Sequence, residues 1–370
     1  MEATLAERVY NFSPGPAALP LPVLEKAQSE LLALPGAGAS VLEISHRSKP
    51  FGEILEKAKS DLIELLSIPD NYRVIFMQGG SRLQFSMVPM NLLRGTGQAA
   101  DYILTGVWGG KARDEAVKEG DVRVVWDGKD SNYDRLPGGD LQLNVDAAYV
   151  HFTSNETIQG VQFLDEPHTS DVPLVCDASS DFLCRPLPID RYGLIYACAQ
   201  KNAGTAGVTV LIIREDLLDR CQESLPGYLN YRLHVQENSL YNTPPTFAVY
   251  LAGLVFRWLK NEVGGVANML ERNRRKSQML YEVIDDSDDF FQGHAQQDCR
   301  SMMNVTFHLP SDELQQAFLD EASRRGLCEL KGHRSVGGIR ASIYNAMPIE
   351  GVELLRDLMV EFCDQNRSSH

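Results

Sequence analysis

Residues 194–213 read Leu194-Ile195-Tyr196-Ala197-Cys198-Ala199-Gln200-Lys201-Asn202-Ala203-Gly204-Thr205-Ala206-Gly207-Val208-Thr209-Val210-Leu211-Ile212-Ile213. Two apolar runs, 194–196 and 208–213, enclose a segment of small residues that carries a lysine. Runs that are apolar throughout are typical of strands covered on both faces of a sheet. We therefore expect two buried strands here, with the lysine placed just after the first of them.

The same kind of run recurs towards the N-terminus. From Arg73 to Glu215, short apolar or β-branched runs alternate with helical or looped stretches, and the earlier runs are 74–76, 102–104, 122–125, 149–152 and 174–176. This alternation predicts an α/β fold in which helices enclose a mainly parallel sheet.

The C-terminal third has a different order of elements. After Thr243-Pro244-Pro245 we expect a helix over 247–262 that ends at Gly264-Gly265. A second helix, a strand, a third helix, a glycine-rich basic stretch and a last helix follow, over 267–284, 303–307, 311–325, 331–340 and 349–362. This order indicates a smaller α+β unit. We place the domain boundary near residue 260, giving a large domain over 1–260, with an N-terminal arm of about 15 residues, and a small domain over 261–370.

Composition limits the classes of function. The chain has 370 residues, of which 44% are hydrophobic and 23% charged, as in globular proteins. Its net charge of -15 would repel a nucleic-acid backbone, so we expect no nucleic-acid partner. Seven Cys show no zinc-ligand spacing and are expected to be reduced, with no metal bound. Residues 1–7 lack a basic targeting pattern and no apolar run could span a membrane, so we expect a cytoplasmic protein without a membrane partner.

A glycine-rich turn is the first candidate site. Gly79-Gly80-Ser81-Arg82 follows a predicted strand and opens a helical stretch over 83–93. Backbone N–H groups at such a turn, together with the positive end of the helix, can hold a phosphate. The alternative is a plain β-to-α turn. The pattern is neither GxGxxG nor a Walker loop, so it does not indicate a dinucleotide or nucleoside-triphosphate site.

Two residues at strand ends could carry chemistry. Asp177 ends a buried strand, where open α/β sheets place their ligands. A buried carboxylate needs a cationic partner such as a protonated pyridine nitrogen, although an Asp that caps the next turn is the alternative. Lys201 lies among small residues that would let a flat ring approach, and a partly buried lysine is a good amine for imine formation. The alternative for Lys201 is an ordinary solvated side chain.

Basic residues form the last candidate cluster. His46-Arg47 lies in the front part of the chain, and His333-Arg334 and Arg340 lie near its end. Guanidinium groups bind carboxylates and phosphates bidentately, so convergence of these residues would suit a substrate with two anionic groups. Scattered surface charges are the alternative.

Taken together, these segments resemble the class-V aminotransferases of the fold-type-I pyridoxal-phosphate (PLP) enzymes, and among them the family that acts on phosphoserine. The matching stretches occur in family order and span nearly the whole chain, at 11–17, 43–47, 78–85, 155–158, 200–202, 241–247 and 331–346. The resemblance implies reversible transamination between O-phospho-L-serine and 2-oxoglutarate, which gives 3-phosphooxypyruvate and L-glutamate in serine biosynthesis. Whether 4-phosphohydroxy-L-threonine, a substrate in pyridoxine biosynthesis, is also used stays open.

The resemblance implies a role for each matching residue of the cofactor site. Lys201 looks like the lysine that holds PLP as a Schiff base and then moves a proton between the substrate Cα and cofactor C4′. Asp177 would face the pyridine nitrogen and keep it protonated. Trp108 would stack on the ring, and Thr157 would bond the region of the 3-hydroxyl group.

The matching positions for the cofactor phosphate are Ser81, Arg82 and Gln200. Asn242 and Thr243 resemble residues that reach the PLP phosphate of the neighbouring subunit, so the resemblance implies a homodimer with shared sites. Thr243, followed by two prolines, also has the residue pattern of a helix N-cap.

The basic residues match the substrate positions of the family. Arg340 resembles the residue that binds the substrate α-carboxylate. His46, Arg47, His333 and Arg334 resemble those that receive the phosphate of phosphoserine or the distal carboxylate of glutamate. Both substrates carry an anion at the far end, so one Arg/His cluster can serve both.

A few positions depart from the family pattern. Ser81 and Leu83 replace glycines of the turn, and Leu83 requires a negative φ to avoid strain. Cys198 stands where the family has glycine, and Pro14 stands at a position that is often a small residue in contact with glutamate. None of these positions is the lysine, the aspartate or a member of the basic cluster.

Three other functions fit parts of the sequence. Another class-V reaction, such as alanine–glyoxylate exchange, would not need the two His-Arg pairs. A nicotinamide-dependent oxidoreductase fits the alternating strands and helices but lacks a GxGxxG after the first strand. A catalytically silent binding protein descended from the enzyme would require loss of the lysine or its partners, and both are present.

Overall fold

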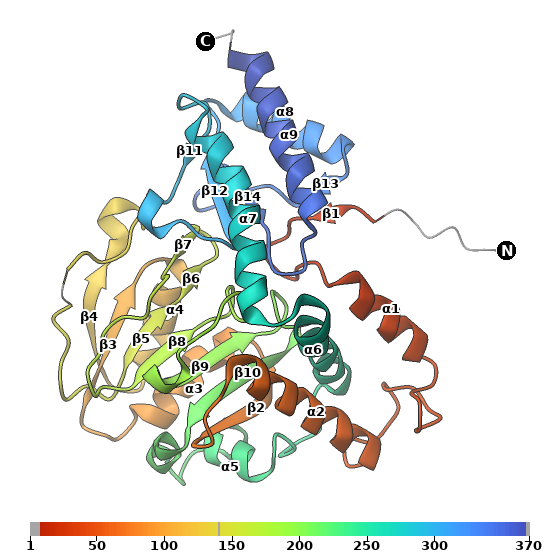
Figure 1. The fold of residues 1–370 in the computed structure, drawn as a ribbon. Coiled ribbons are helices and arrows are strands. Elements are labelled where there is room, and N and C mark those ends of the chain that lie inside the picture. The colour runs from red at the N-terminus through yellow and green to blue at the C-terminus, as the bar shows by residue number, and fades with distance from the viewer. Residues whose placement is uncertain (1–7, 140, 368–370) are drawn as a thin grey trace.

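A seven-stranded sheet forms the centre of the larger part of the molecule (Figure 1). In spatial order its strands are β2 (Tyr72–Gly79), β10 (Gly207–Arg214), β9 (Tyr192–Cys198), β8 (Leu174–Asp177), β5 (Val150–Thr153), β3 (Ala99–Leu104) and β4 (Asp121–Asp127). The pairings from β9 to β4 are parallel, whereas β10 runs antiparallel to both β9 and β2. The predicted mainly parallel sheet is therefore confirmed.

Helices cover both faces of this sheet. Side chains alternate along β2, so Val74 and Phe76 enter one core while Ile75 and Met77 enter the other. The first core is closed by α2 (Lys49–Leu66) and α6 (Thr246–Trp258), which are flanked by α1 (Leu21–Glu30). The second is closed by α3 (Ser81–Leu92), α4 (Val107–Ala116) and α5 (Tyr231–Gln236). Burial on both faces explains why the inner strands read as continuous apolar runs, whereas the edge strand β4 has no buried residue.

The C-terminal part has its own sheet and core. Its antiparallel strands are β11 (Gln292–Gly293), β12 (Asn304–His308) and β14 (Ile339–Ser342), and its helices are α7 (Val266–Asp285), α8 (Asp312–Arg324) and α9 (Ile349–Asn366). The N-terminal strand β1 (Tyr10–Asn11) pairs in parallel with β13 (Leu327–Cys328) of this part (Figure 1). Residues 10–11 are thus joined to the C-terminal part. The domain boundary near residue 260 stays a prediction.

Short elements complete the chain. A hairpin of β6 (Asn155–Glu156) and β7 (Val161–Gln162) follows β5. A π-helical turn, Leu259–Val263, extends α6 to Gly264, whose φ of 84° ends the helix as expected. The 3₁₀ turns are Gly128–Ser131, Ile189–Arg191, Glu215–Arg220, Gly227–Leu229 and Gln297–Cys299.

The expected helix N-cap at Thr243 is wrong. Helix α6 begins at Thr246 with Pro245 in the N-cap position, and Pro245 makes no side-chain cap. The reason is steric, because a residue that precedes proline is driven away from the α-helical region. An N-cap at Thr243 would make Pro244 the first helical residue, and Pro244 precedes Pro245, so a helix does not begin there; the structure starts it at Thr246.

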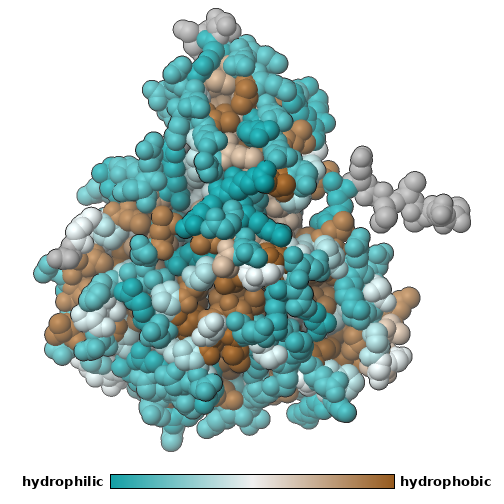
Figure 2. Space-filling model, viewed as in Figure 1, coloured by the Kyte–Doolittle hydropathy of each residue, from teal (hydrophilic) through white to brown (hydrophobic). Residues whose placement is uncertain are grey.

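The computed structural model describes residues 8–139 and 141–367. Residues 1–7, on which the expected cytoplasmic location was based, lie outside these ranges. Within them, no helix is long and apolar enough to cross a membrane. On the face drawn in Figure 2, hydrophilic residues cover most of the C-terminal part, whereas hydrophobic residues gather over the sheet-bearing part.

Candidate active site

A cavity of about 310 Å³ lies at the carboxyl ends of three neighbouring strands. Thr153, Asp177 and Cys198 are the last residues of β5, β8 and β9, and all three line the cavity. Parallel strands end at one edge of a sheet, which is where α/β proteins bind ligands. Nine predicted site residues line this cavity: Ser81, Arg82, Trp108, Thr157, Asp177, Gln200, Lys201, His333 and Arg340.

Lys201 projects into the cavity beside Thr157. Its Nζ donates a hydrogen bond of 2.6 Å to Thr157 Oγ1 and lies 6.0 Å from the centre of the Trp108 ring. A Cβ atom added to Gly15 would lie 3.4 Å from Lys201 Cγ, so the N-terminal segment packs closely against the lysine side chain. The backbone N–H of Ala17 donates to the carbonyl of Gln200, which fixes this segment beside the lysine.

Asp177 presents a buried carboxylate with an exposed fraction of 3%. Burial raises the pKa of Asp177, while hydrogen bonds from Ser179 and the charge of Lys201 act in the opposite direction. Oδ1 accepts the backbone N–H of Ser179 at 3.0 Å, so the predicted turn cap is present as well. Among the described residues, no Lys or Arg forms an ion pair with Asp177. The carboxylate therefore has room for a cationic partner from the cavity side.

The glycine-rich turn opens helix α3 at the same cavity. Gly80 is the N-cap of α3 and supplies no side chain, so the first N–H groups of the helix are open to an anion. The hydroxyl groups of Ser81 and Ser179 lie 2.5 Å apart and join the turn to the end of β8. Gly79 takes the positive φ of 92°, whereas Leu83 does not have a positive φ. The replacement of glycine by leucine is therefore accommodated without backbone strain.

Basic groups converge on the other side of the cavity. Arg340 is only 7% exposed, and its Nε is buried without a hydrogen-bond partner in the described part of the chain. Burial lowers the pKa of Arg340. The pKa of His333 is also lowered, mainly by burial and then by the charges of Arg340, Arg334 and Lys111. This region is positive and suits an anion.

Five predicted residues do not line this cavity: Arg334, His46, Arg47, Asn242 and Thr243. Arg334 is exposed but close enough to affect the pKa of His333 and of Lys111. His46 and Arg47 lie in the turns before α2. Asn242 Nδ2 donates to Gln78 Oε1 at 3.0 Å. The roles expected for these residues stay predictions.

Lys111 belongs to this region but was not predicted from the sequence. Its Nζ lies 4.3 Å from the centre of the Trp108 ring, a cation–π distance. Burial lowers the pKa of Lys111, the charges of Arg82 and Arg334 lower it further, and Glu156 opposes them. The sequence contained one signal for Lys111, its spacing from Trp108. A residue three positions further along a helix lies on the same helix face, so Lys111 could have been expected beside the Trp108 ring.

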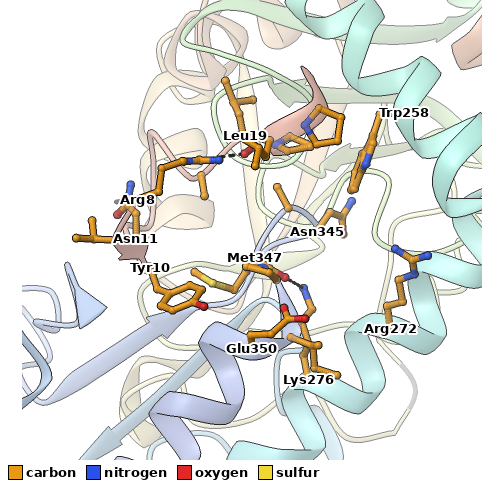
Figure 3. Close-up of a pocket in the computed structure, with 18 of the residues that line it drawn as sticks. Arg8, Tyr10, Asn11, Leu19, Trp258, Arg272, Lys276, Asn345, Met347 and Glu350 are labelled. Atoms are coloured by element: carbon orange, nitrogen blue, oxygen red, sulfur yellow. Dashed lines mark hydrogen bonds between the residues drawn. The ribbon is translucent and has the colours of Figure 1, made fainter. Parts of the chain in front are cut away.

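A larger cleft of about 640 Å³ lies elsewhere, between the N-terminal segment, α7 and the loop before α9 (Figure 3). Its buried lysine, Lys276, donates hydrogen bonds to the carbonyls of Ile343, Tyr344 and Met347 at 2.9, 2.7 and 3.3 Å. That amine is therefore occupied by structural contacts. Of the two cavities, the smaller one combines an accessible amine, a buried carboxylate and an anion-binding region.

Comparison with known proteins identifies the class. The profile of the family "Aminotransferase class-V" matches residues 9–355, and the chain belongs to this family. The expected fold type is confirmed. Pyridoxal phosphate is the cofactor of the class, which confirms the cofactor prediction.

Within the class, the chain is similar to phosphoserine aminotransferases. The one from Rhodopirellula baltica is 59% identical over 366 residues, which are 98% of this chain and 97% of that protein. The one from Geobacillus kaustophilus is 54% identical and covers 96% of this chain and 98% of its own. The solved structure from Bacillus circulans subsp. alkalophilus has a TM-score of 0.95 at 47% identity, covering 98% and 100% of the two chains.

The residues of the cavity fit the cofactor. Lys201 offers an amine, Asp177 a buried carboxylate in need of a cation, and α3 an open helix N-terminus for a phosphate. The indole Nε1 of Trp108 is buried without a partner among residues 8–139 and 141–367, while the ring lines the cavity. An aromatic face, an anion site and a carboxylate are what a phosphorylated pyridine ring requires.

Proposed function

We propose that this chain catalyses reversible transfer of an amino group between O-phospho-L-serine and 2-oxoglutarate, giving 3-phosphooxypyruvate and L-glutamate in serine biosynthesis. The observation that carries the proposal is the buried Arg340, which has no ion-pair partner among the described residues and lies with His333 at the cavity of Lys201. An amino-acid substrate with an anion at its far end carries two negative groups. Its α-carboxylate can bind one of these basic side chains and its distal anion the other. The similarity to phosphoserine aminotransferases supports this substrate.

Two residues carry the chemistry in this proposal. When bound, PLP supplies an aldehyde for the amino group and a ring that accepts electrons. Lys201 Nζ would take the proton from the substrate Cα and deliver it to C4′ of the cofactor, and would run the same transfer in reverse with the second substrate. Asp177 holds its negative charge beside the ring nitrogen, where a cation offsets the burial that raises its pKa.

The remaining cofactor residues position the ring and its phosphate. Ser81, Arg82 and Gln200 bind the phosphate together with the N-terminus of α3, which adds the positive end of a helix dipole. Trp108 packs on the face of the ring, and Thr157 bonds the region of the 3-hydroxyl group.

The basic residues select the substrates. Arg340 binds the α-carboxylate, and His333 and Arg334 receive the distal phosphate or carboxylate with His46 and Arg47. A pocket used by both substrates of a transaminase must accept either anion, and Arg side chains bind both bidentately. The substrate 4-phosphohydroxy-L-threonine carries the same distal group and is the second candidate.

We further propose a homodimer with shared active sites. His46, Arg47, Asn242 and Thr243 do not line the cavity of their own chain, and each would complete the site of the partner subunit. Mixing Lys201→Ala with Thr243→Val protein tests this idea, because a mixed dimer then regains one site with both residues intact. Sedimentation as a monomer, or no recovery of activity in re-associated mixtures, would contradict it.

Two further expectations are part of the proposal. The chain is placed in the cytoplasm. It is divided into domains over 1–260 and 261–370, which is supported by the separate core around β12, α8 and α9. Hydrogen exchange should then show two cooperative units, and a single unit would argue against the boundary.

The test of substrate choice is glutamate formation from 2-oxoglutarate by the PLP-loaded protein. O-phospho-L-serine should be strongly preferred over serine and alanine as amino donor. If alanine works equally well, PLP chemistry remains but the basic residues have been misassigned. An alanine–glyoxylate exchange would also leave Arg334→Ala active, whereas the proposed reaction predicts a severe loss.

A further inference from the structure

Glu156 is a fully buried carboxylate that has no role in the proposed reaction. It lies in β6, between Asn155 and Thr157 at the edge of the cavity. Oε2 accepts the backbone N–H of Trp108 at 3.1 Å, and Oε1 accepts that of Gly109 at 2.9 Å. These N–H groups belong to the first turn of α4, where helices leave donors without partners.

Helix α4 is therefore capped by a residue from a different part of the chain. Its own N-cap is Gly106, which has no side chain to do so. A Cβ atom at Gly106 would lie 2.4 Å from Glu156 Cδ, well inside contact distance. The φ of Gly106 is 174°, an extended value that any residue can adopt. Glycine is thus required here for the space that the carboxylate occupies, not for its backbone freedom.

The carboxylate is electrostatically part of the site. Burial raises the pKa of Glu156 to about 7, and the N–H groups of Gly109 and Trp108 oppose that rise. The charge of Asp177 raises the pKa and that of Lys201 lowers it. Asp177 and Lys201, which carry the chemistry of the proposed reaction, are therefore close enough to interact electrostatically with Glu156.

We infer that Glu156 is a positioning residue, which holds the first turn of α4 so that the Trp108 ring stays against the cofactor. The inference rests on the proposed function for the role of Trp108. One carboxylate accepts two hydrogen bonds, from the backbone N–H groups of Trp108 and Gly109, and so fixes the backbone of both residues. A loosened first turn would let the indole ring move away from the cavity.

The experiment measures PLP affinity of the protein without substrate, from quenching of tryptophan fluorescence and from the visible absorbance of bound PLP. Glu156→Gln keeps one acceptor but points an amide N–H at the other donor. It should weaken PLP binding about tenfold, the effect of one lost charge-assisted hydrogen bond. Gly106→Ala retains the carboxylate but displaces it, and should weaken binding by a similar factor.

A double-variant cycle separates positioning from general damage. In a Trp108→Ala background, Glu156→Gln should change PLP affinity less than twofold, because the ring that it positions is gone. Glu166→Gln is the matched control. The side chain of Glu166 is only 5% exposed, and its carboxylate accepts hydrogen bonds from Arg185 at 3.2 Å and Tyr192 at 2.8 Å outside the cavity. This variant should lower the melting temperature and leave PLP affinity unchanged.

Unchanged PLP affinity in both Glu156→Gln and Gly106→Ala would overturn the inference. A tenfold loss that persists in the Trp108→Ala background would overturn it too, since Glu156 would then act without the ring. Failure of the proposed function is distinguishable, because it would appear as lost preference for phosphoserine in the wild-type protein, whereas these measurements use no substrate.

Discussion

Replacing Arg340 by methionine should make the protein more stable and much less active. Arg340 lies in β14, is 7% exposed, and forms no ion pair with another described residue. A buried charge without a partner costs several kcal/mol of folding free energy. Because the cavity admits water, we expect Arg340→Met to raise the free energy of unfolding of the cofactor-free protein by only about 1–2 kcal/mol.

The loss of activity follows from the contacts that a guanidinium makes with a carboxylate. Two charge-assisted hydrogen bonds contribute about 1.5–3 kcal/mol each. Their removal corresponds to a fall in kcat/KM of roughly 10²- to 10⁴-fold at 1.36 kcal/mol per decade. The assays are urea unfolding followed by circular dichroism and glutamate formation from phosphoserine.

Arg300→Met is the matched control for this prediction. Arg300 bonds both oxygens of Asp285, at 2.7 and 2.6 Å, and the Asp285 side chain is 40% exposed. Loss of this partly solvated pair should reduce stability by about 1 kcal/mol and leave kcat/KM unchanged. If Arg340→Met is less stable than wild type, or keeps kcat/KM within tenfold, the assignment of Arg340 as an unpaired substrate-binding cation is refuted.

Four further results are expected. Lys201→Ala should abolish turnover with an unchanged far-ultraviolet circular dichroism spectrum, and an active variant would end the assignment of this lysine. Lys111→Gln should raise KM for phosphoserine about tenfold and raise the pKa of His333, because one neighbouring positive charge is removed; pH titration of His333 by NMR checks the second effect. Lys276→Met should reduce the free energy of unfolding in urea by about 3 kcal/mol, because three buried carbonyls lose their donor. The unfolded chain releases the Glu156 proton near pH 4.5 and the folded chain near pH 7, so stability should fall as pH rises between these values; urea unfolding should show a shallower slope for Glu156→Gln.

The sheet and the centre of the site were predictable because their signals are local. Each apolar or β-branched run became a strand; for the inner strands the reason is that burial on both faces leaves a continuous apolar pattern, whereas the edge strand β4 is mostly exposed and is marked by its β-branched valines. Asp177 and Lys201 were expected to lie close together because strand ends of an α/β sheet meet at one edge, and both line the same cavity. The antiparallel direction of β10 was not predicted, because an apolar run carries no information on the direction of its neighbours.

Contacts between distant segments explain what the sequence did not reveal. Glu156 caps a helix that begins 49 residues earlier, at Val107, and such a pair has no local pattern. The N-cap expected at Thr243 failed for a local reason, the steric effect of two successive prolines. His46 and Arg47 do not line the cavity, and composition and spacing could not show this, because they carry no information on which distant segments meet.

The N-terminal segment limits how the C-terminal part can move. Phe12 N–H bonds the carbonyl of Cys328, and Tyr344 Oη donates to the carbonyl of Pro14, whereas Ala17 is bonded to Gln200 beside Lys201. Only two residues, 15 and 16, separate the last anchor on the C-terminal part from the first anchor on the large sheet. A link of that length spans about 10 Å at most and cannot stretch. Any displacement of the C-terminal part must therefore keep Tyr344 within this reach of Gln200, so the short link holds that part close to Lys201.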